Sequence, residues 1–305
     1  MPRPRPLPDG LAASPFRVAE ALELGATPRR LRARDLDAPF HGVRTVTPAN
    51  DLLSLCRAYA VRMPQGHYFS HVTAARLWGL PLPSALRGDR RLHVSTAGRE
   101  PRARGVVGHR IAEGAEIRFV EELPVLAPCD AWCQLGAVLL QGDDLVIAGD
   151  RLLGWPDPLA SPDELGAAIS RFAGRRGARA VARARRDIRA RSGSPRETVV
   201  RLIVARAGFP EPEPNGPVEL SGGRRTHGDL VFRAHRLLLE YDGEQHRLDA
   251  RRFRRDIDRI NDLQDAGWVV IRVHAGTPHA EIIARLDAGL RARGWEGAPR
   301  APWVS

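Results

Sequence analysis

Two short apolar segments on either side of residue 235 constrain the fold of this chain more than any other feature. The first is Leu230-Val231-Phe232, directly after Asp229, and the second is Leu237-Leu238-Leu239, followed by Glu240-Tyr241-Asp242-Gly243. Apolar runs of this length, separated by a few polar residues, predict two buried strands joined by a short turn. Carboxylates directly next to buried strands are unusual, because an unpaired buried charge is costly.

The side chains of the second strand alternate between two faces. This alternation puts Leu238, Glu240 and Asp242 on one face, and Leu237, Leu239 and Tyr241 on the other. If the two strands pair as a hairpin, Asp229 lies near Glu240. Grouped carboxylates suit a hard cation, since Mg²⁺ binds one or two carboxylates and keeps several waters. We therefore expect a Mg²⁺ (or Mn²⁺) site here, with a pair of structural acids as the alternative.

Length and composition set the outer limits. The 305 residues suggest about two domains, and the hydrophobic and charged fractions, 43% and 27%, are those of a globular chain. Neither a membrane-spanning apolar run nor a signal peptide is expected from the sequence. Three cysteines without metal-ligand spacing favour the reducing cytoplasm, with Cys129 and Cys133 as buried thiols rather than metal or redox groups.

The positive charge is concentrated in one segment. The net charge is +11 without a single lysine, and Arg171–Arg191 holds nine arginines against only Asp187. Such a block is either a solvated helix face or a surface for phosphates. For phosphate contact we select Arg183, Arg185 and Arg186.

After a predicted disordered tail over residues 1–15, residues 16–48 show the outline of a winged helix-turn-helix. A helix is predicted from Phe16 to Gly25, a second helix from its cap at Thr27-Pro28 through Leu31 to Asp35, and a strand over 42–46. The second helix would present four arginines to DNA: Arg29, Arg30, Arg32 and Arg34. A small interaction domain with the same outline is the alternative.

Residues 49–155 are expected to form an α/β part. The sequence predicts helices over 49–62, after Ser70, and over 129–140 and 143–153, with strands over 92–95, 106–111 and 116–120. His71, next to the capping Ser70, is interpreted as a capping or core histidine rather than a catalytic one.

Three motifs in this region resemble the AbiEi-like (type IV) antitoxin regulators. They are His41-Gly42-Val43, the segment Phe69-Ser70-His71-Val72-Thr73-Ala74-Ala75-Arg76-Leu77-Trp78-Gly79-Leu80, and the segment Leu123-Pro124-Val125-Leu126-Ala127-Pro128-Cys129-Asp130-Ala131-Trp132. The resemblance covers residues 11–155 and implies a DNA-binding head, a second α/β part and a candidate toxin partner. Cys129-Asp130 replaces the Arg-Thr pair usual in that family.

Residues 156–192 are predicted to be a linker with two basic helices, 163–173 and 176–191, and residues 193–295 a second domain before a tail over 296–305. Its first helix is signalled by Ser194 as N-cap, Pro195 at the first helical position and Glu197 as the partner in a capping box.

The second domain resembles the restriction-endonuclease-like, or PD-(D/E)XK, superfamily, in the branch of the very-short-patch-repair endonucleases. The matching segments are Ser194-Pro195-Arg196-Glu197, Gly228-Asp229-Leu230-Val231-Phe232, Leu239–His246, Phe253-Arg254-Arg255-Asp256 with Arg259, and Gly267–Val273. The resemblance implies an α/β fold with a central mixed sheet, in the order helix, three strands, helix, strand, helix.

This resemblance also implies metal-assisted phosphodiester hydrolysis. Asp229 and Glu240 would hold the metal, Glu197 would add a ligand, and Asp242 shares the face of Glu240. Gln245 or His246 would orient the attacking water or the phosphate, and His246 could serve as a base. The alternatives are a capping role for Glu197 and an exposed turn position for His246.

The lysine that the superfamily has two residues after Glu240 is replaced by Asp242, which leaves open the group that stabilises the developing negative charge. Arg272 and an arginine of the predicted helix 249–266 are the candidates. We therefore expect a cytoplasmic, metal-dependent DNA endonuclease, in which cutting both strands would favour a homodimer. The alternative is a non-catalytic DNA-binding regulator or antitoxin with a degenerate nuclease fold.

Overall fold

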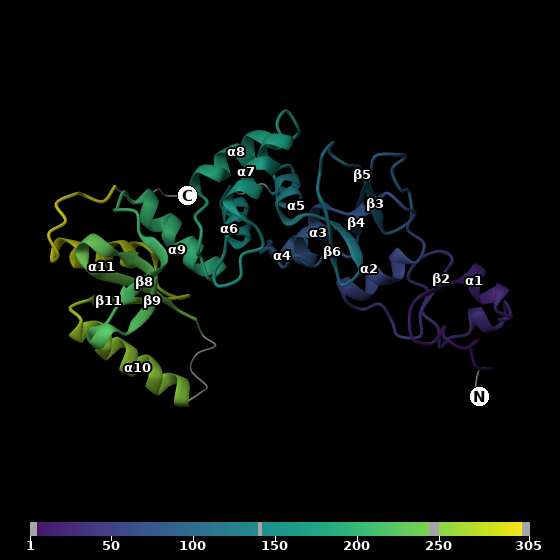
Figure 1. Ribbon diagram of the computed structural model, residues 1–305, viewed down its shortest axis with the longest axis horizontal. Helices are drawn as coiled ribbons and strands as arrows, with labels where there is room; N and C mark the ends of the chain where they lie inside the picture. Colours follow the sequence, from purple (N-terminus) through teal and green to yellow (C-terminus); the bar gives the residue numbers. More distant parts are fainter. Residues whose placement is uncertain (1–4, 140–141, 244–249, 301–305) are drawn as a thin grey trace. The chain divides into compact units, whose positions relative to one another are not determined.

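The computed structural model describes residues 5–139, 142–243 and 250–300, with the side chains of residues 250–256 excepted. The chain divides into unit 1, Met1–Leu140 with Asp163–Val181, and unit 2, Gln141–Pro162 with Ala182–Ser305. Both units mix helices and strands (Figure 1). This division differs from the predicted boundaries at 155/156 and 192/193, because residues 141–162 pack with the later part of the chain and residues 163–181 with the earlier part.

The first part of unit 1 is a cluster of short elements around an apolar core. They are β1 (Phe16–Arg17), α1 (Val18–Glu23), the 3₁₀ turn η1 (Arg30–Arg32) and β2 (Val43–Arg44), with β1 antiparallel to β2. The core contains Leu11, Phe16 and Leu31, so Leu11 is packed although it lies in the segment 1–15 predicted to be a disordered tail.

The predicted second α-helix, from Thr27-Pro28 through Leu31 to Asp35, is wrong. The chain makes only the three-residue turn η1, and Ala33 is already extended, with φ −69° and ψ 149°. Arg30 folds back onto Asp35 through two hydrogen bonds of 3.0 and 2.9 Å, which holds the reversal of the chain. A segment of this length cannot form the recognition helix that the four arginines were expected to occupy.

A five-stranded mixed sheet forms the centre of the rest of unit 1. Its order is β5-β4-β3-β7-β6, with β3 (His67–Phe69), β4 (Leu92–Thr96), β5 (Val106–Arg110), β6 (Ile117–Val120) and β7 (Leu123–Leu126). The helices are α2 (Leu52–Ala60), α3 (His71–Leu77), α4 (Ser84–Arg87), α5 (Pro128–Leu135) and α7 (Pro162–Arg171). Tyr59, Phe69 and Val125 lie in its core.

Unit 2 is built on a four-stranded mixed sheet of order β11-β10-β9-β8, in agreement with the mixed sheet expected for the second domain. Its strands are β8 (Glu213–Glu219), β9 (Arg225–Phe232), β10 (Leu237–Asp242) and β11 (Val269–His274). Only β10 and β11 run parallel to each other. The predicted order of helices and strands from Ser194 onward is also confirmed.

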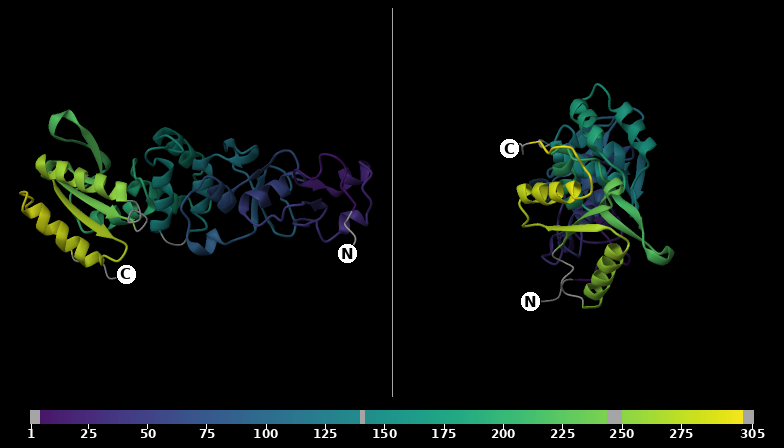
Figure 2. Two further views of the ribbon diagram at one scale, coloured as in Figure 1. Left: turned by 90° about the horizontal axis from the view of Figure 1, so that it is seen from below. Right: turned by 90° about the vertical axis from the view of Figure 1, so that its left-hand side faces the viewer.

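Helices cover both faces of this sheet (Figure 2). One face packs on α9 (Pro195–Arg206) and α11 (His279–Arg291) through Val204, Leu239 and Leu286. The other face packs on α10 (Ala250–Asp265) through Leu238 and Leu263. Leu238 and Leu239 thus point to opposite faces, as the alternation of residues in this strand predicts.

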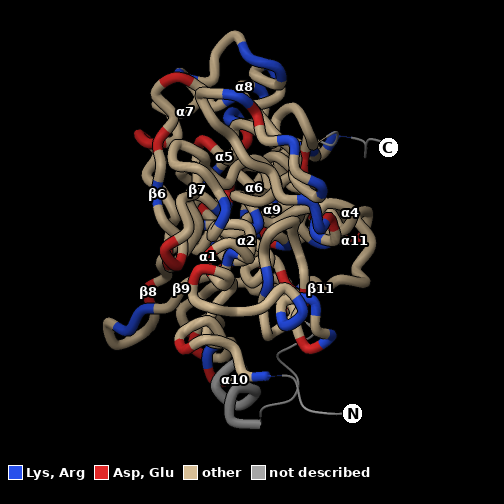
Figure 3. The backbone as a smooth tube through the Cα atoms, turned by 90° about the vertical axis from the view of Figure 1, so that its right-hand side faces the viewer, with Lys and Arg blue, Asp and Glu red and all other residues tan. Residues whose placement is uncertain are grey.

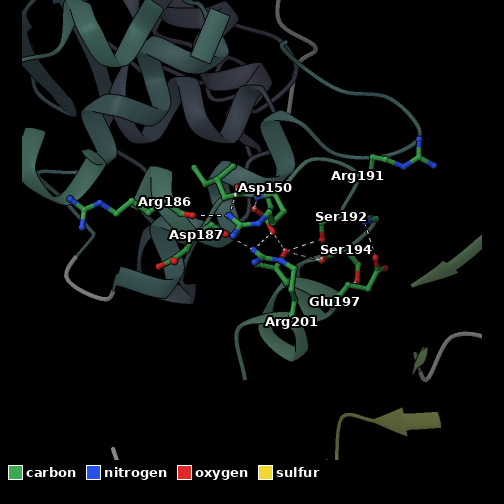
Figure 4. A network of polar contacts seen from close by, with 12 residues as sticks. Asp150, Arg186, Asp187, Arg191, Ser192, Ser194, Glu197 and Arg201 are labelled. Atoms are coloured by element: carbon green, nitrogen blue, oxygen red, sulfur yellow. Dashed lines mark hydrogen bonds and ion pairs between the residues drawn. The ribbon is translucent and has the colours of Figure 1, made fainter. Parts of the chain in front are cut away.

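A buried ion pair joins α6 (Gly142–Leu152) to α9 within unit 2 (Figure 4). Arg201 Nη2 donates to Asp150 Oδ2 at 2.8 Å, and the two side chains are 2% and 1% exposed. Thr198 donates to the same carboxylate, and Arg189 N donates to its other oxygen, both at 2.8 Å. Because the charges and most of the hydrogen-bonding groups are paired, this burial does not leave Asp150 isolated.

Among the described helices, none is long and apolar enough to cross a membrane.

Candidate functional site

Asp229 and Glu240 are neighbours on the α10 face of the unit 2 sheet. The antiparallel pairing of β9 with β10 runs from Phe232↔Leu237 to Leu230↔Leu239 and then stops. Beyond this point Tyr241 N donates to Asp229 Oδ2 at 2.7 Å, so a carboxylate replaces the next backbone partner. Asp229 therefore lies within β9, at the point where β9 and β10 separate, and not at the end of the strand.

Arg259 of α10 is the cation closest to Glu240 in the contacts of this site. Its Nη2 and Nη1 donate to the two Glu240 oxygens at 2.6 and 2.8 Å. Its Nε donates to Thr226 Oγ1 at 3.1 Å, and Nη2 also donates to His227 O at 2.5 Å. Since the guanidinium is held on several sides, it fixes the orientation of the Glu240 carboxylate.

The Asp229 carboxyl is partly buried and has a pKa raised to about 7. Burial is the main cause, followed by the negative charges of Glu240 and Glu197. The hydrogen bond from Tyr241 N and the charge of Arg259 act in the opposite direction without cancelling the increase. Three carboxylates therefore interact at this site although they come from β9, β10 and α9.

Glu197 is held by polar groups on the other side of the site. Ser194 caps α9 by accepting from Glu197 N at 3.2 Å, as predicted. The expected return bond of a capping box is wrong, because Glu197 Oε2 accepts from Gly193 N at 2.8 Å and from Asn215 Nδ2 at 2.7 Å. A side chain at position 193 would put its Cβ 3.1 Å from Glu197 Oε1, so glycine allows this close approach without displacing the carboxylate.

Asp242 lies on the same strand face as Glu240 but pairs with a different arginine. Arg272 Nη2 of β11 donates to Asp242 Oδ2 at 3.0 Å. Of the two arginine candidates for stabilising charge at the site, Arg272 is thus engaged with Asp242, while Arg259 contacts Glu240. Gln245 and His246, expected to orient water or phosphate, lie outside the described residues.

The arginines expected to contact DNA are not equivalent. Arg29 and Arg34 are exposed, whereas Arg30 is paired with Asp35 and Arg32 Nε donates to Pro28 O at 3.1 Å. In the basic helix α8 (Ala178–Asp187), Val181 and Ala184 are buried, Arg183 and Arg186 are exposed, and Arg185 is partly buried. The blue segments of α8 in Figure 3 show this density of arginine.

Three histidines of unit 1 stack on one another, an arrangement that the sequence did not reveal. The ring centroids of His71 and His109 are 3.6 Å apart, and His93 Nδ1 lies 2.9 Å from His109 Nε2. Burial, with the charges of the other histidines, lowers the pKa of His71 to about 2 and that of His93 to about 4. The sequence alone could not show this cluster, because His93 and His109 come together only through the pairing of β4 with β5.

Within the described part of the chain, no group of three or more His, Cys, Asp or Glu is arranged to hold a metal ion. The histidine rings are near-parallel, at 19° for His71 and His109, so their in-plane lone pairs do not converge on one point. Cys56, Cys129 and Cys133 are buried free thiols, as expected for Cys129 and Cys133, and burial raises the pKa of Cys129 to about 12. In unit 2, Asp229 and Glu240 are neighbouring carboxylates, of which Glu240 is paired with Arg259.

Comparison with protein-family models, with curated proteins and with solved structures gives no match.

Proposed function

We propose that the protein is a metal-dependent DNA endonuclease whose active site contains Asp229, Glu240 and Glu197. The observation that carries the proposal is the position of Asp229. A partly buried carboxyl lies next to a second carboxylate and within the field of a third, which raises its pKa to about 7. Such an arrangement weakens the fold and is common where a site must bind a cation or move a proton.

The carboxylates Asp229 and Glu240 fit Mg²⁺ or Mn²⁺ as a two-carboxylate site, because hard cations accept oxygen ligands and keep waters in the other positions. The bound ion would polarise a phosphoryl oxygen and make a bound water more acidic. Glu197 Oε2 accepts hydrogen bonds from Gly193 N and Asn215 Nδ2, which it would lose by binding the ion directly. Glu197 is therefore better placed to contact the ion through a water molecule.

The protein side chains would prepare this site for DNA. Arg259 holds the Glu240 carboxylate in one orientation and brings positive charge to where a phosphate would lie. Asp229, with its pKa about 7, would lose its proton when the cation binds. Gln245 and His246 keep the proposed role of orienting the attacking water.

Targeting to DNA is assigned to the antitoxin-like head, with exposed arginines as phosphate contacts. Arg183 and Arg186 are the better candidates in α8, and Arg29 and Arg34 in the head, because their side chains are exposed. The free thiols favour the cytoplasm as the location of the protein. The toxin partner and the homodimer belong to the same proposal.

A second candidate is a DNA-binding regulator that does not cut. It is favoured by the ion pair in which Arg259 contacts both oxygens of Glu240, since an internal cation already neutralises this acid. Glu197 likewise has two hydrogen-bond partners that give it a structural role.

Incubation of supercoiled plasmid with Mg²⁺ or Mn²⁺ separates the two candidates. We expect nicking or cutting by the wild type and a loss of at least about 100-fold in Asp229→Ala and Glu240→Ala. Glu213→Gln is the matched control, because Glu213 lies in the same sheet and pairs with exposed Arg233. Equal cutting by all four proteins would point to a contaminating nuclease, and no cutting of any substrate by the wild type would favour the regulator.

A further inference from the structure

Trp155 is an exposed tryptophan held against the acidic site of unit 2. Its residue surface is 37% exposed. Trp132 and Trp268 are buried, and Trp78 and Trp295 are partly buried, so among the described residues Trp155 alone exposes its indole to this extent. An indole in water is costly, and exposed aromatic rings are typical of binding surfaces.

The backbone around Trp155 is fixed by the segment that leads into α9. Trp155 N donates to Ser192 O at 3.1 Å, and Arg191 N donates to Leu153 O at 2.8 Å. The residue after Ser192 is Gly193, whose N–H binds Glu197 Oε2. The tryptophan is therefore tied to the same loop that positions one acid of the proposed active site.

The ring of Trp155 also contacts the strand that carries Asp229. Its centroid is 5.0 Å from that of His227, with 39° between the ring planes. His227 precedes Asp229 by two residues on β9, so both side chains lie on the same face, about 6.6 Å apart along the strand. His227 O accepts from Arg259, the partner of Glu240. The indole thus lies against the residue two positions before Asp229 on the same face of β9.

We infer that Trp155, supported by His227, is a stacking platform for an unpaired nucleobase whose neighbouring phosphate lies at Asp229 and Glu240. The inference rests on the proposed function and adds the kind of substrate to it. A nucleobase offers a flat π face of the size of indole, and base–aromatic stacking tolerates all sequences. In an intact duplex both faces of each base are already covered, so the platform selects single strands or a base displaced from the helix.

Binding of short DNA to the full-length protein is measured with Ca²⁺, a hard cation that takes carboxylate oxygens, so that the acid site can accept a phosphate. Gel electrophoresis of the probes after the measurement checks that they stay intact. The probes are a fluorescein-labelled 12-nucleotide single strand, the same strand with abasic sites, a perfect duplex, and a duplex with one unpaired base. The variants are Trp155→Ala and Trp155→Phe. Phe119→Ala is the matched control, because Phe119 is an exposed aromatic residue of unit 1, with 68% exposure.

We expect Trp155→Ala to weaken binding of the single strand by about 5- to 150-fold, and Trp155→Phe by less, since phenylalanine can still stack. Binding of the abasic strand should be the same for all variants, because it retains the phosphates and lacks the bases. Phe119→Ala should behave as the wild type. If only the duplex with an unpaired base is affected, the platform receives a displaced base.

Unchanged affinity of Trp155→Ala for both the single strand and the duplex with an unpaired base, or an equal loss for the abasic strand, would overturn the platform. Stacking should also quench the indole emission of the wild type but not of Trp155→Phe, and this readout serves if Trp155→Ala does not fold. The proposed nuclease is tested separately by plasmid cutting. If Trp155 stacks on bases but no plasmid is cut, the protein is a single-strand-binding protein. If plasmid is cut but Trp155 does not stack on bases, the protein is a nuclease that contacts its substrate in another way.

Discussion

At the scale of one residue, Asp229 differs from the apolar residues of the core because it is an ionisable group in a partly buried position. Its ionised carboxylate is disfavoured by burial and by Glu240 and Glu197, so its pKa is raised to about 7. Between its unfolded pKa near 3.8 and this value, the folded chain binds more protons than the unfolded chain. The stabilising contribution of this group is therefore complete at low pH and is lost as the pH rises through about 7.

We expect Asp229→Asn to raise the free energy of unfolding by about 1–3 kcal/mol at pH 8, and by less towards pH 5. Asparagine keeps an oxygen for Tyr241 N but carries no charge. Urea denaturation at pH 5, 6.5 and 8 measures the gain, and Glu213→Gln, which removes an acid whose pKa is lowered by Arg233, should give no gain. A lower stability of Asp229→Asn at pH 8 would identify the carboxylate as a structural partner.

Arg259 is the residue that offsets part of this charge. Replacement by glutamine leaves Glu240, which is 12% exposed, without its cation, and we expect a loss of about 2–3 kcal/mol in unfolding free energy. The loss should be larger at pH 8 than at pH 5, because protonation of Asp229 at the lower pH removes its repulsion with Glu240. Arg225→Gln is the control, since Arg225 and Glu219 form an exposed pair worth less than about 1 kcal/mol. Equal losses in the two variants would contradict the special position of Arg259.

At the scale of helices and strands, most local signals were reliable, with the segment from Thr27 to Asp35 as an exception, whereas of the long-range contacts only the pairing of β9 with β10 was predicted. The start of α9 follows from Ser194 and Pro195, and the faces of β10 follow from alternation, because each depends on neighbours in sequence. β7 was missed since it contains Pro124, which lowers the propensity for a strand. The cation beside the acids could be narrowed only to Arg272 or an arginine of the predicted helix 249–266, because contact across a sheet face depends on how α10 packs.

The link between α6 and α9 gives a test at this scale, because two ion pairs join the same helices. Asp150–Arg201 is buried, whereas Asp143–Arg206 is about half exposed, at 45% and 51%. We expect Asp150→Ala to cost about 3–5 kcal/mol by leaving Arg201 buried without its partner, and Asp143→Ala to cost less than about 1 kcal/mol. Urea denaturation measures both, and similar losses would show that burial does not decide the strength of the link.

At the scale of the whole chain, the exchange of segments between the two units was not predictable. A proline-rich segment at 156–162 is a good boundary signal, yet α6 before it belongs to unit 2 and α7 after it to unit 1. Composition shows where the chain leaves regular structure, but it does not show which core the next helix joins. The histidine cluster of unit 1 depends in the same way on long-range pairing.

The cluster gives unit 1 a pH dependence opposite to that of Asp229 in unit 2. His71 has φ +49°, an unfavourable value for a residue other than glycine, and stacks on His109. Burial lowers the pKa of all three histidines, and the mutual histidine charges lower those of His71 and His93 further. Among their charged neighbours, Asp89 and Glu100 act to raise the pKa and Arg91 to lower it. The folded state thus binds fewer protons than the unfolded state below about pH 6.5.

Acidification from pH 7.5 to 5.5 should therefore destabilise unit 1 by about 2 kcal/mol, while Asp229 makes unit 2 more stable over the same range. Hydrogen exchange read by mass spectrometry, corrected for the intrinsic rate at each pH, follows peptides from the two units separately. His109→Gln should reduce the pH dependence in unit 1, whereas His279→Gln, at an exposed position of α11, should leave it unchanged. Parallel changes in both units would contradict this prediction, because the histidines and Asp229 act with opposite sign and could not both dominate the response of their units.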